Sequence, residues 1–352
     1  RPDTIWDLPY YLDWAEFKEY MLIYAIGRIA DMLRERGLGG LVYTHNCPTY
    51  PSSPFNIPRT EREAVDVMGI DLCLKRADYV KSRDMCRFVA ASSRLPFLPE
   101  FGTGCWMWLK PMPLEHKIFG GWSVMMNGAR AINHFMIADR DRYFGAALAR
   151  DGRRREGHFE YHREANRFIS ETRFNEKRLR SDIAVLHMHD YERFESLCSL
   201  VQPAPPEALG GAPPEWFCAH GPVSGLQFSP IHAYPRHRRA LYNGFLAAGY
   251  SVSPADSEIS VEALSAFRLV AAPSFSFMNG GLQQRLLDYA RGGGVLLLGP
   301  DLPLMDEYMR ETGPLGALLR KPADRIPQAH FKGLNLGETH VFENAEPFIE
   351  CA

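Results

Sequence analysis

Glu100 has the setting of a reactive carboxylate. It lies near the end of an apolar run over residues 95–101, directly after Pro99, and is followed by Trp106 and Trp108. Indole faces can stack on a sugar ring, and retaining glycoside hydrolysis uses one carboxylate as nucleophile and a second carboxyl group, about 5 Å away, as proton donor. We therefore predict that Glu100 supplies one of the two carboxyl groups of a retaining glycoside hydrolase. A solvated loop carboxylate is the common alternative for a Glu in a Pro- and Gly-rich loop.

Polar residues also follow other strand-like runs in this part of the chain. They are the candidates for a substrate pocket around Glu100: His45, Asn46, Asp71, Asn133 and His134. The carboxyl ends of parallel strands meet at one edge of a sheet, where barrel enzymes place their active sites. For Asp71 and His134 taken singly, helix capping or backbone bonding is an equal alternative.

Four strand-loop-helix units must position these residues. A helix is expected over residues 14–36, with Gly37 as its stop. Strand-like runs cover residues 40–46, 67–74, 95–101 and 129–136, and helices are expected at 76–92 and 114–127. This alternation predicts an α/β fold with a parallel sheet, and four units make half of a (β/α)8 TIM barrel, which takes about 250 residues when complete. We assign residues 1–175 to the C-terminal half of such a barrel and expect the other half upstream.

A second domain is expected over residues 181–325. Buried strands are predicted at 182–187, 268–273 and 294–299, alternating with helices at 235–249 and 280–291. This pattern is typical of a doubly wound α/β domain. No Cys lies near Pro273–Met278, where an amidotransferase would carry its nucleophile, so we interpret the domain as structural. Residues 326–352 are expected to begin a further β-type domain.

Composition restricts the partner and the compartment. The chain has 352 residues, 46% of them hydrophobic, and a formal net charge of -2, which gives no reason to expect nucleic acid or a membrane surface as a partner. Its 7 cysteines are scattered, without the spacing of a zinc site or a disulfide framework. We expect a cytoplasmic protein that needs no metal or cofactor and binds a neutral small molecule or another protein.

The same residues resemble a known group of enzymes. The run Leu-Pro-Phe-Leu-Pro-Glu-Phe-Gly-Thr-Gly around Glu100 is similar to the nucleophile strand of clan A β-galactosidases, chiefly glycoside hydrolase families 35 and 42. Residues 128–136 resemble the last barrel strand of that group, residues 42–46 the fifth and residues 69–72 the sixth. The segment from 181 to about 310 resembles the glutamine-amidotransferase-like trimerisation domain that follows the barrel in family 42.

This resemblance implies an exo-acting β-galactosidase that forms homo-oligomers, possibly trimers. Glu100 matches the nucleophile, while Asn46, Trp106, Trp108 and Asn133 match the surroundings of the sugar subsite. The acid/base Glu of the family belongs to an Asn-Glu pair just before the helix that here begins near residue 14. No such pair precedes that helix in this chain, so we expect the proton donor upstream of residue 1. The clustered cysteines that bind zinc in some members of family 42 are also lacking.

Other interpretations stay open. The missing proton donor motivates an alternative function, a non-catalytic carbohydrate-binding or assembly protein derived from such an enzyme. His187 and His189 could bind a metal at a strand end, but a structural role is favoured because no third ligand lies nearby in the sequence. His158 and His162 are interpreted as part of a solvated helix surface, and the arginines at 153–155 as a solvated turn rather than an anion site.

Overall fold

The computed structural model describes residues 6, 8–45, 56–73, 76–104, 110–197, 230–311 and 313–318, together with short strands at 324–325, 334–336, 339–341 and 349–350. The chain divides into two compact units. The Glu100 unit comprises Ile23–Pro51 and Ile57–Arg180, and the doubly wound unit comprises Arg1–Leu22, Ser52–Asn56 and Ser181–Ala352. None of the helices in the described residues has the length and hydropathy needed to span a membrane.

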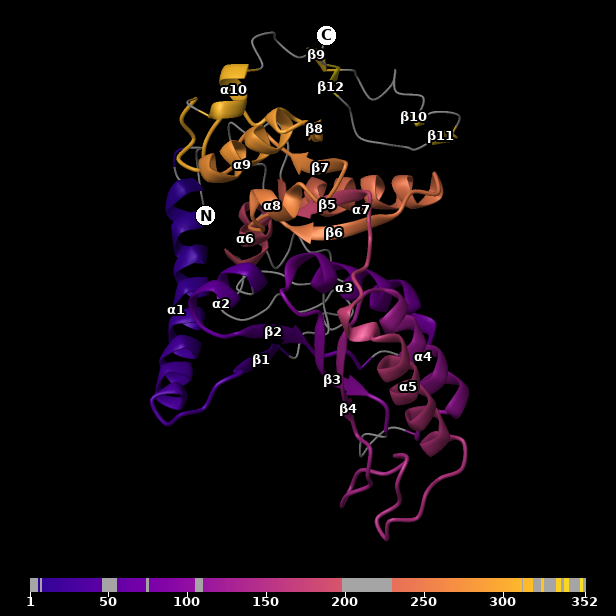
Figure 1. The fold of residues 1–352 in the computed structure, drawn as a ribbon. Coiled ribbons are helices and arrows are strands. Elements are labelled where there is room, and N and C mark those ends of the chain that lie inside the picture. The colour runs from indigo at the N-terminus through magenta and orange to yellow at the C-terminus, as the bar shows by residue number, and fades with distance from the viewer. Residues whose placement is uncertain are drawn as a thin grey trace, which may run out of the picture. The chain divides into compact units, whose positions relative to one another are not determined.

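Four parallel strands form the framework of the Glu100 unit (Figure 1). They are β1 (Val42–His45), β2 (Val67–Ile70), β3 (Phe97–Gly102) and β4 (Ala131–Phe135). β1 pairs with β2 and β3 pairs with β4, both in parallel, and a parallel bridge between Leu72 and Phe101 joins the two pairs. The predicted strand at 67–74 is shorter than expected because the chain past Ile70 makes only this single bridge.

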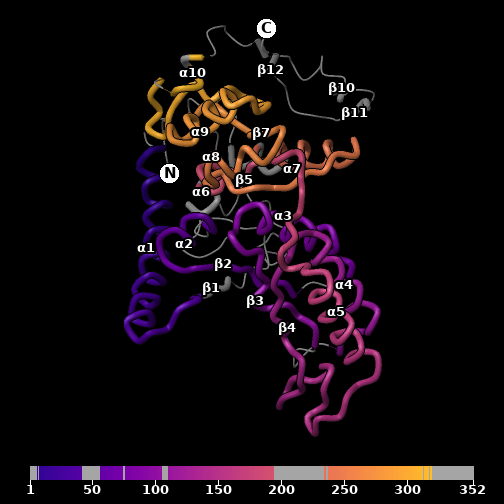
Figure 2. Tube along the Cα trace, viewed as in Figure 1, coloured from indigo at the N-terminus to yellow at the C-terminus, as the bar shows by residue number. Residues whose placement is uncertain are grey.

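Helices separate these strands along the chain. They are α2 (Ile57–Glu63), α3 (Tyr79–Ser92), α4 (Leu114–Met126) and α5 (His158–Thr172), with short 3-10 turns η2 (Arg76–Asp78) and η3 (Phe174–Glu176). Figure 2 follows the path from β3 through α4 to β4 and α5. The rings of Trp122 and Phe168, 5.2 Å apart, join α4 to α5. The sequence predicted α3 and α4 well, whereas α2 lies between two of the predicted strands, where no helix was expected.

Helix α1 (Leu8–Arg34) starts six residues before the predicted position. Leu8 and Leu12 are buried, which extends the apolar pattern toward the N-terminus, and a proline at the second helical position is compatible with a first turn. The predicted stop is confirmed, because Gly37 has a φ of 80° and donates a backbone hydrogen bond to the Arg34 carbonyl (2.9 Å). Only glycine adopts this left-handed conformation without strain.

The doubly wound unit is built on one parallel sheet with the strand order β6-β5-β7-β8. Its strands are β5 (Ile183–His187), β6 (Val252–Asp256), β7 (Leu269–Ser274) and β8 (Val295–Pro300). Its helices are α6 (His189–Leu197), α7 (Pro230–Ala247), α8 (Val261–Leu264), α9 (Gly280–Arg291) and α10 (Pro314–Leu318). Tyr242 and Phe245 of α7 pack on Val185 and Val252 to form a buried core. The predicted doubly wound topology is confirmed, with β6 as a strand that we had not placed.

The last part of the chain contributes short antiparallel pairs. β9 (Asp324–Arg325) pairs with β12 (Ile349–Glu350), and β10 (Leu334–Leu336) pairs with β11 (Thr339–Val341). That residues 326–352 begin a further β-type domain stays a prediction.

Candidate active site

Glu100 lies at an irregularity in the pairing of β3 with β4. Leu98 faces Ile132 and Phe101 faces His134, so two residues of β3, Pro99 and Glu100, oppose one residue of β4. Such a bulge bends a strand and redirects one side chain, and bulges are common beside active sites. Proline is tolerated there because it has no N–H to leave without a partner. The bulge thus gives Glu100 an orientation that regular alternation along β3 would not produce.

Hydrogen bonds fix the bulge from both sides. The Leu72 N–H donates to the Glu100 carbonyl (2.7 Å), and the Gly102 N–H donates to the Leu72 carbonyl (3.0 Å). From β4, Nδ2 of Asn133 donates to the Pro99 carbonyl (3.0 Å). The backbone of Glu100 is therefore held between its two neighbours in the sheet, which is the preorganisation that a nucleophile requires.

The carboxyl group of Glu100 lies beside Asp71 and Cys73. Partial burial and the charge of Asp71 raise the pKa of Glu100, and a hydrogen bond from the Cys73 thiol opposes this rise. The bond is long, with 3.9 Å between Cys73 Sγ and Glu100 Oε1. Although Cys73 is exposed as a residue, desolvation of its sulfur and the charges of Glu100 and Asp71 raise its pKa to about 12. Cys73 is thus a neutral donor, and the repulsion by Asp71 makes the Glu100 carboxylate more basic.

The structure brings together some of the predicted site residues. Asp71 directly follows β2 and Asn133 lies on β4, and both lie near Glu100 or its backbone. His134 does not join them, because its ring packs 5.9 Å from Phe101 and 4.6 Å from His162, toward the helices. Neighbouring residues of a strand point to opposite faces, so this placement gives no support to a substrate contact by His134. Other candidates lie outside what the structure describes: Asn46, Trp106 and Trp108 entirely, and His45 for its side chain.

Sequence reasoning missed Cys73 as a neighbour of the nucleophile. We had counted it only among scattered cysteines. A signal was present, because Cys73 stands two residues after Asp71 in an extended segment, and such residues face the same side. Its thiol cannot serve as the second carboxyl group of a retaining mechanism. Its chemical role here is to donate a weak hydrogen bond to Glu100.

The interpretation of His158 and His162 as a solvated surface is wrong for His162. His162 lies on the buried face of α5 and is 6% exposed. The arginine-rich turn is solvated at Arg153, whose side chain is 82% exposed, whereas Arg155 binds Asp139.

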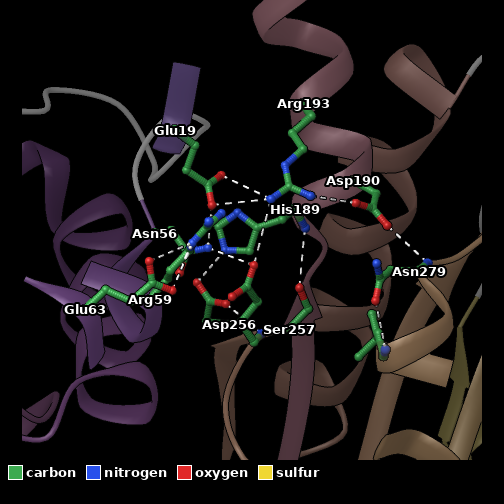
Figure 3. A network of polar contacts seen from close by, with 12 residues as sticks. Glu19, Asn56, Arg59, Glu63, His189, Asp190, Arg193, Asp256, Ser257 and Asn279 are labelled. Atoms are coloured by element: carbon green, nitrogen blue, oxygen red, sulfur yellow. Dashed lines mark hydrogen bonds and ion pairs between the residues drawn. The ribbon is translucent and has the colours of Figure 1, made fainter. Parts of the chain in front are cut away.

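His189 belongs to a buried polar network in the doubly wound unit (Figure 3). The ring of His187, which is also buried, lies 5.7 Å from that of His189. His189 Nε2 lies 2.8 Å from Asp256 Oδ2. Burial alone would lower the pKa of His189, but the charge and hydrogen bond of Asp256 raise it to about 10. Arg193 joins the carboxylate of Asp190 (2.8 Å) to that of Glu19 (3.3 Å). These contacts indicate a structural ion-pair network, and no group of three potential metal ligands occurs among the described residues.

Comparisons with known proteins agree with this architecture. A profile of the family described as "GLMA-like, second domain" matches residues 237–332, within the doubly wound unit. No curated protein sequence matches the chain.

Solved β-galactosidases are similar in structure at low sequence identity. The enzyme from psychrophilic Marinomonas ef1 is 16% identical, with a TM-score of 0.60 over 92% of this chain and 50% of that chain. A GH42 β-galactosidase from G. stearothermophilus is 15% identical, with a TM-score of 0.60 over 85% of this chain and 42% of that chain. The enzyme from the haloarchaeon Halorubrum lacusprofundi is 16% identical, with a TM-score of 0.56 over 88% of this chain and 45% of that chain.

At this level of identity the likeness concerns the fold. The chain spans about half the length of these enzymes or less. It therefore has the α/β fold of a corresponding part of β-galactosidases, a parallel strand-helix unit followed by a doubly wound, GLMA-like domain.

Proposed function

We propose that the chain forms part of a retaining glycoside hydrolase in which Glu100 attacks the anomeric carbon of a terminal β-linked galactose. The observation that carries the proposal is the position of Glu100, on a strand bulge that hydrogen bonds hold from both neighbouring strands. A glycosidase nucleophile must be ionised and must approach one carbon atom accurately. The fixed backbone supplies the accuracy, and the nearby charge of Asp71 supplies basicity.

In the proposed reaction the Glu100 carboxylate forms a bond to the anomeric carbon while the bond to the leaving oxygen breaks. Water then attacks the glycosyl-enzyme ester and releases Glu100. Asn133 is a positioning residue, because its amide holds the Pro99 carbonyl within the bulge. We place the proton donor on residues outside this chain, as the resemblance to family 42 implies.

Covalent labelling tests the nucleophile separately from the proton donor. A 2-deoxy-2-fluoro-β-galactoside with a dinitrophenolate leaving group needs no acid catalyst for the first step, and its fluorine slows the second step. Mass spectrometry of the complete protein should find one fluorogalactosyl adduct on the peptide containing Glu100. Glu100→Gln should abolish the adduct, whereas the matched control Glu115→Gln on the surface of α4 should keep it.

Azide rescue provides a second measurement. Glu100→Ala should lose turnover of an activated aryl galactoside, and azide should restore part of it with a glycosyl azide as product. Near wild-type turnover by Glu100→Ala, or an adduct on another residue, would contradict the assignment. Galactoside binding without any adduct or turnover by the wild-type protein would support the non-catalytic binding protein instead.

A further inference from the structure

A second cluster of polar side chains is buried in the Glu100 unit, on the side of β3 and β4 that faces α4 and α5 (Figure 1). Thr103 follows β3 and is 0% exposed, Lys117 of α4 is 1% exposed, and His162 of α5 is 6% exposed. His134 of β4 packs against His162 with ring centroids 4.6 Å apart. Four elements of the fold thus place polar groups together away from solvent, and the proposed reaction does not use this cluster.

Hydrogen bonding within the cluster is incomplete. Thr103 Oγ1, His134 Nδ1 and His162 Nε2 are buried without a hydrogen-bond partner among the described residues. The Lys117 ammonium group has three donors, yet the hydrogen bond identified for it is a long one of 3.4 Å to the Gly145 carbonyl. Buried polar groups in native proteins nearly always have partners, and an unpaired one is costly. The Lys117 ammonium group and the Thr103 hydroxyl can therefore donate hydrogen bonds to a bound group.

The charges show which sign that group must have. Burial and the charge of Arg155 lower the pKa of Lys117 to about 8, so its side chain is still mainly a cation near pH 7. Asp139 opposes this shift, but its carboxylate already accepts two hydrogen bonds from Arg155, at 3.0 and 2.5 Å. Burial and the nearby Lys117 lower the pKa of His134 to about 4, and burial, His134 and Lys117 lower that of His162 to about 3, so both rings are neutral near pH 7. Lys117 and Arg155 then share the single carboxylate of Asp139. A charged group that binds beside Lys117 must therefore be an anion rather than a metal ion.

The available space limits its size. Lys117 and Thr103 contribute to the lining of a cavity of about 20 Å³. Two further basic residues, Arg76 and His116, and the apolar side chains of Phe101 and Phe119 also line it, whereas His134 and His162 do not. A cavity of this volume holds about one water-sized group. A phosphate or an organic carboxylate exceeds that space, whereas a halide ion fits. We propose that the Glu100 unit binds a single chloride ion beside Lys117 and Thr103, with the Lys117 ammonium group as its counter-ion.

Crystallography with bromide tests the site directly. Crystals of the chain grown in sodium bromide should show an anomalous peak in this cavity, within hydrogen-bonding distance of Lys117 Nζ or Thr103 Oγ1. Crystals of Lys117→Met should show none there. A cavity that contains only water, with no anomalous signal in the wild-type protein, would overturn the proposal.

Thermal unfolding tests the same site in solution. Replacement of sodium gluconate by sodium chloride at constant ionic strength should raise the midpoint by about 2–4 °C, as expected for a ligand that binds only the folded state. The exposed control Lys177→Met should keep this shift, whereas Lys117→Met should lose it. Should Lys117→Met fail to fold, Thr103→Val provides the second variant, with a reduced shift. An identical chloride shift in all variants, or no shift in the wild-type protein, would count against a specific site.

Discussion

Acid should destabilise the Glu100 unit through His162. Burial holds the pKa of His162 at about 3 in the folded state, against an ordinary value of 6.5. A base whose folded pKa is lowered contributes full stability above its unfolded pKa, and this contribution disappears as the pH falls from 6.5 toward 3. At pH 5 the unfolded chain holds the proton and the folded chain does not. The resulting loss is about 2 kcal/mol relative to pH 8, from RT ln(1 + 10^1.5).

Urea denaturation measures this loss. Unfolding free energies of the wild-type chain and of His162→Gln are compared at pH 8 and pH 5, with gluconate as the salt so that no halide occupies the cavity beside Lys117. Between these pH values the wild-type chain should lose about 2 kcal/mol more than the variant. Arg167→Gln is the matched control on α5, because its side chain is 70% exposed, and it should behave like the wild-type chain. Equal losses in the wild-type chain and His162→Gln would refute the buried, neutral state of His162.

Three further variants test other parts of the structure. Arg193→Met should lower the free energy of unfolding of the doubly wound unit by about 3–5 kcal/mol in urea titrations, because the fully buried Glu19 loses its cation. Asp71→Asn should lower the pKa of Glu100 by removing a neighbouring negative charge, so the acid limb of the labelling rate should move to lower pH. Gly69→Ala should cost about 1–3 kcal/mol in the same titrations, since its new Cβ would lie 2.3 Å from the ring of the proline before Glu100.

Most of the strands and helices, though not α2 and β6, could be predicted because local sequence determines them. Apolar and β-branched runs indicated β2, β3 and β5, and the helical spacing of apolar residues indicated α3 and α9. The bulge at Glu100 could not be predicted, because it depends on which residue of β4 faces which residue of β3. Register is a tertiary property. The same limit applies to Cys73, whose contact with Glu100 crosses from the segment after β2 to β3.

The Lys117 cluster escaped prediction for a different reason. Polar residues are usually exposed to solvent, so His162 was interpreted as part of a solvated helix surface. It nevertheless stands in the same helical stripe as Ala165, and both residues are buried. Lys117 stands on the buried face of α4, together with Gly121, Val124 and Met125. A polar residue within an apolar stripe should therefore be predicted to be buried. Its burial costs free energy unless hydrogen bonds or an opposite charge compensate for the lost hydration.

The two proposed sites use opposite faces of β3, and this separation determines how they can influence one another. Glu100 is directed toward Asp71 and Cys73, whereas Phe101 packs against His134 on the side of the Lys117 cluster. The groups that act on the pKa of Glu100 are its own desolvation, Asp71 and Cys73, and Lys117 is not among them. Occupation of the chloride site should therefore stabilise the end of β3 without changing the basicity of the nucleophile. Because the backbone of β3 is the shared element, a coupling between the sites would require a change in the bulge register rather than a change in charge.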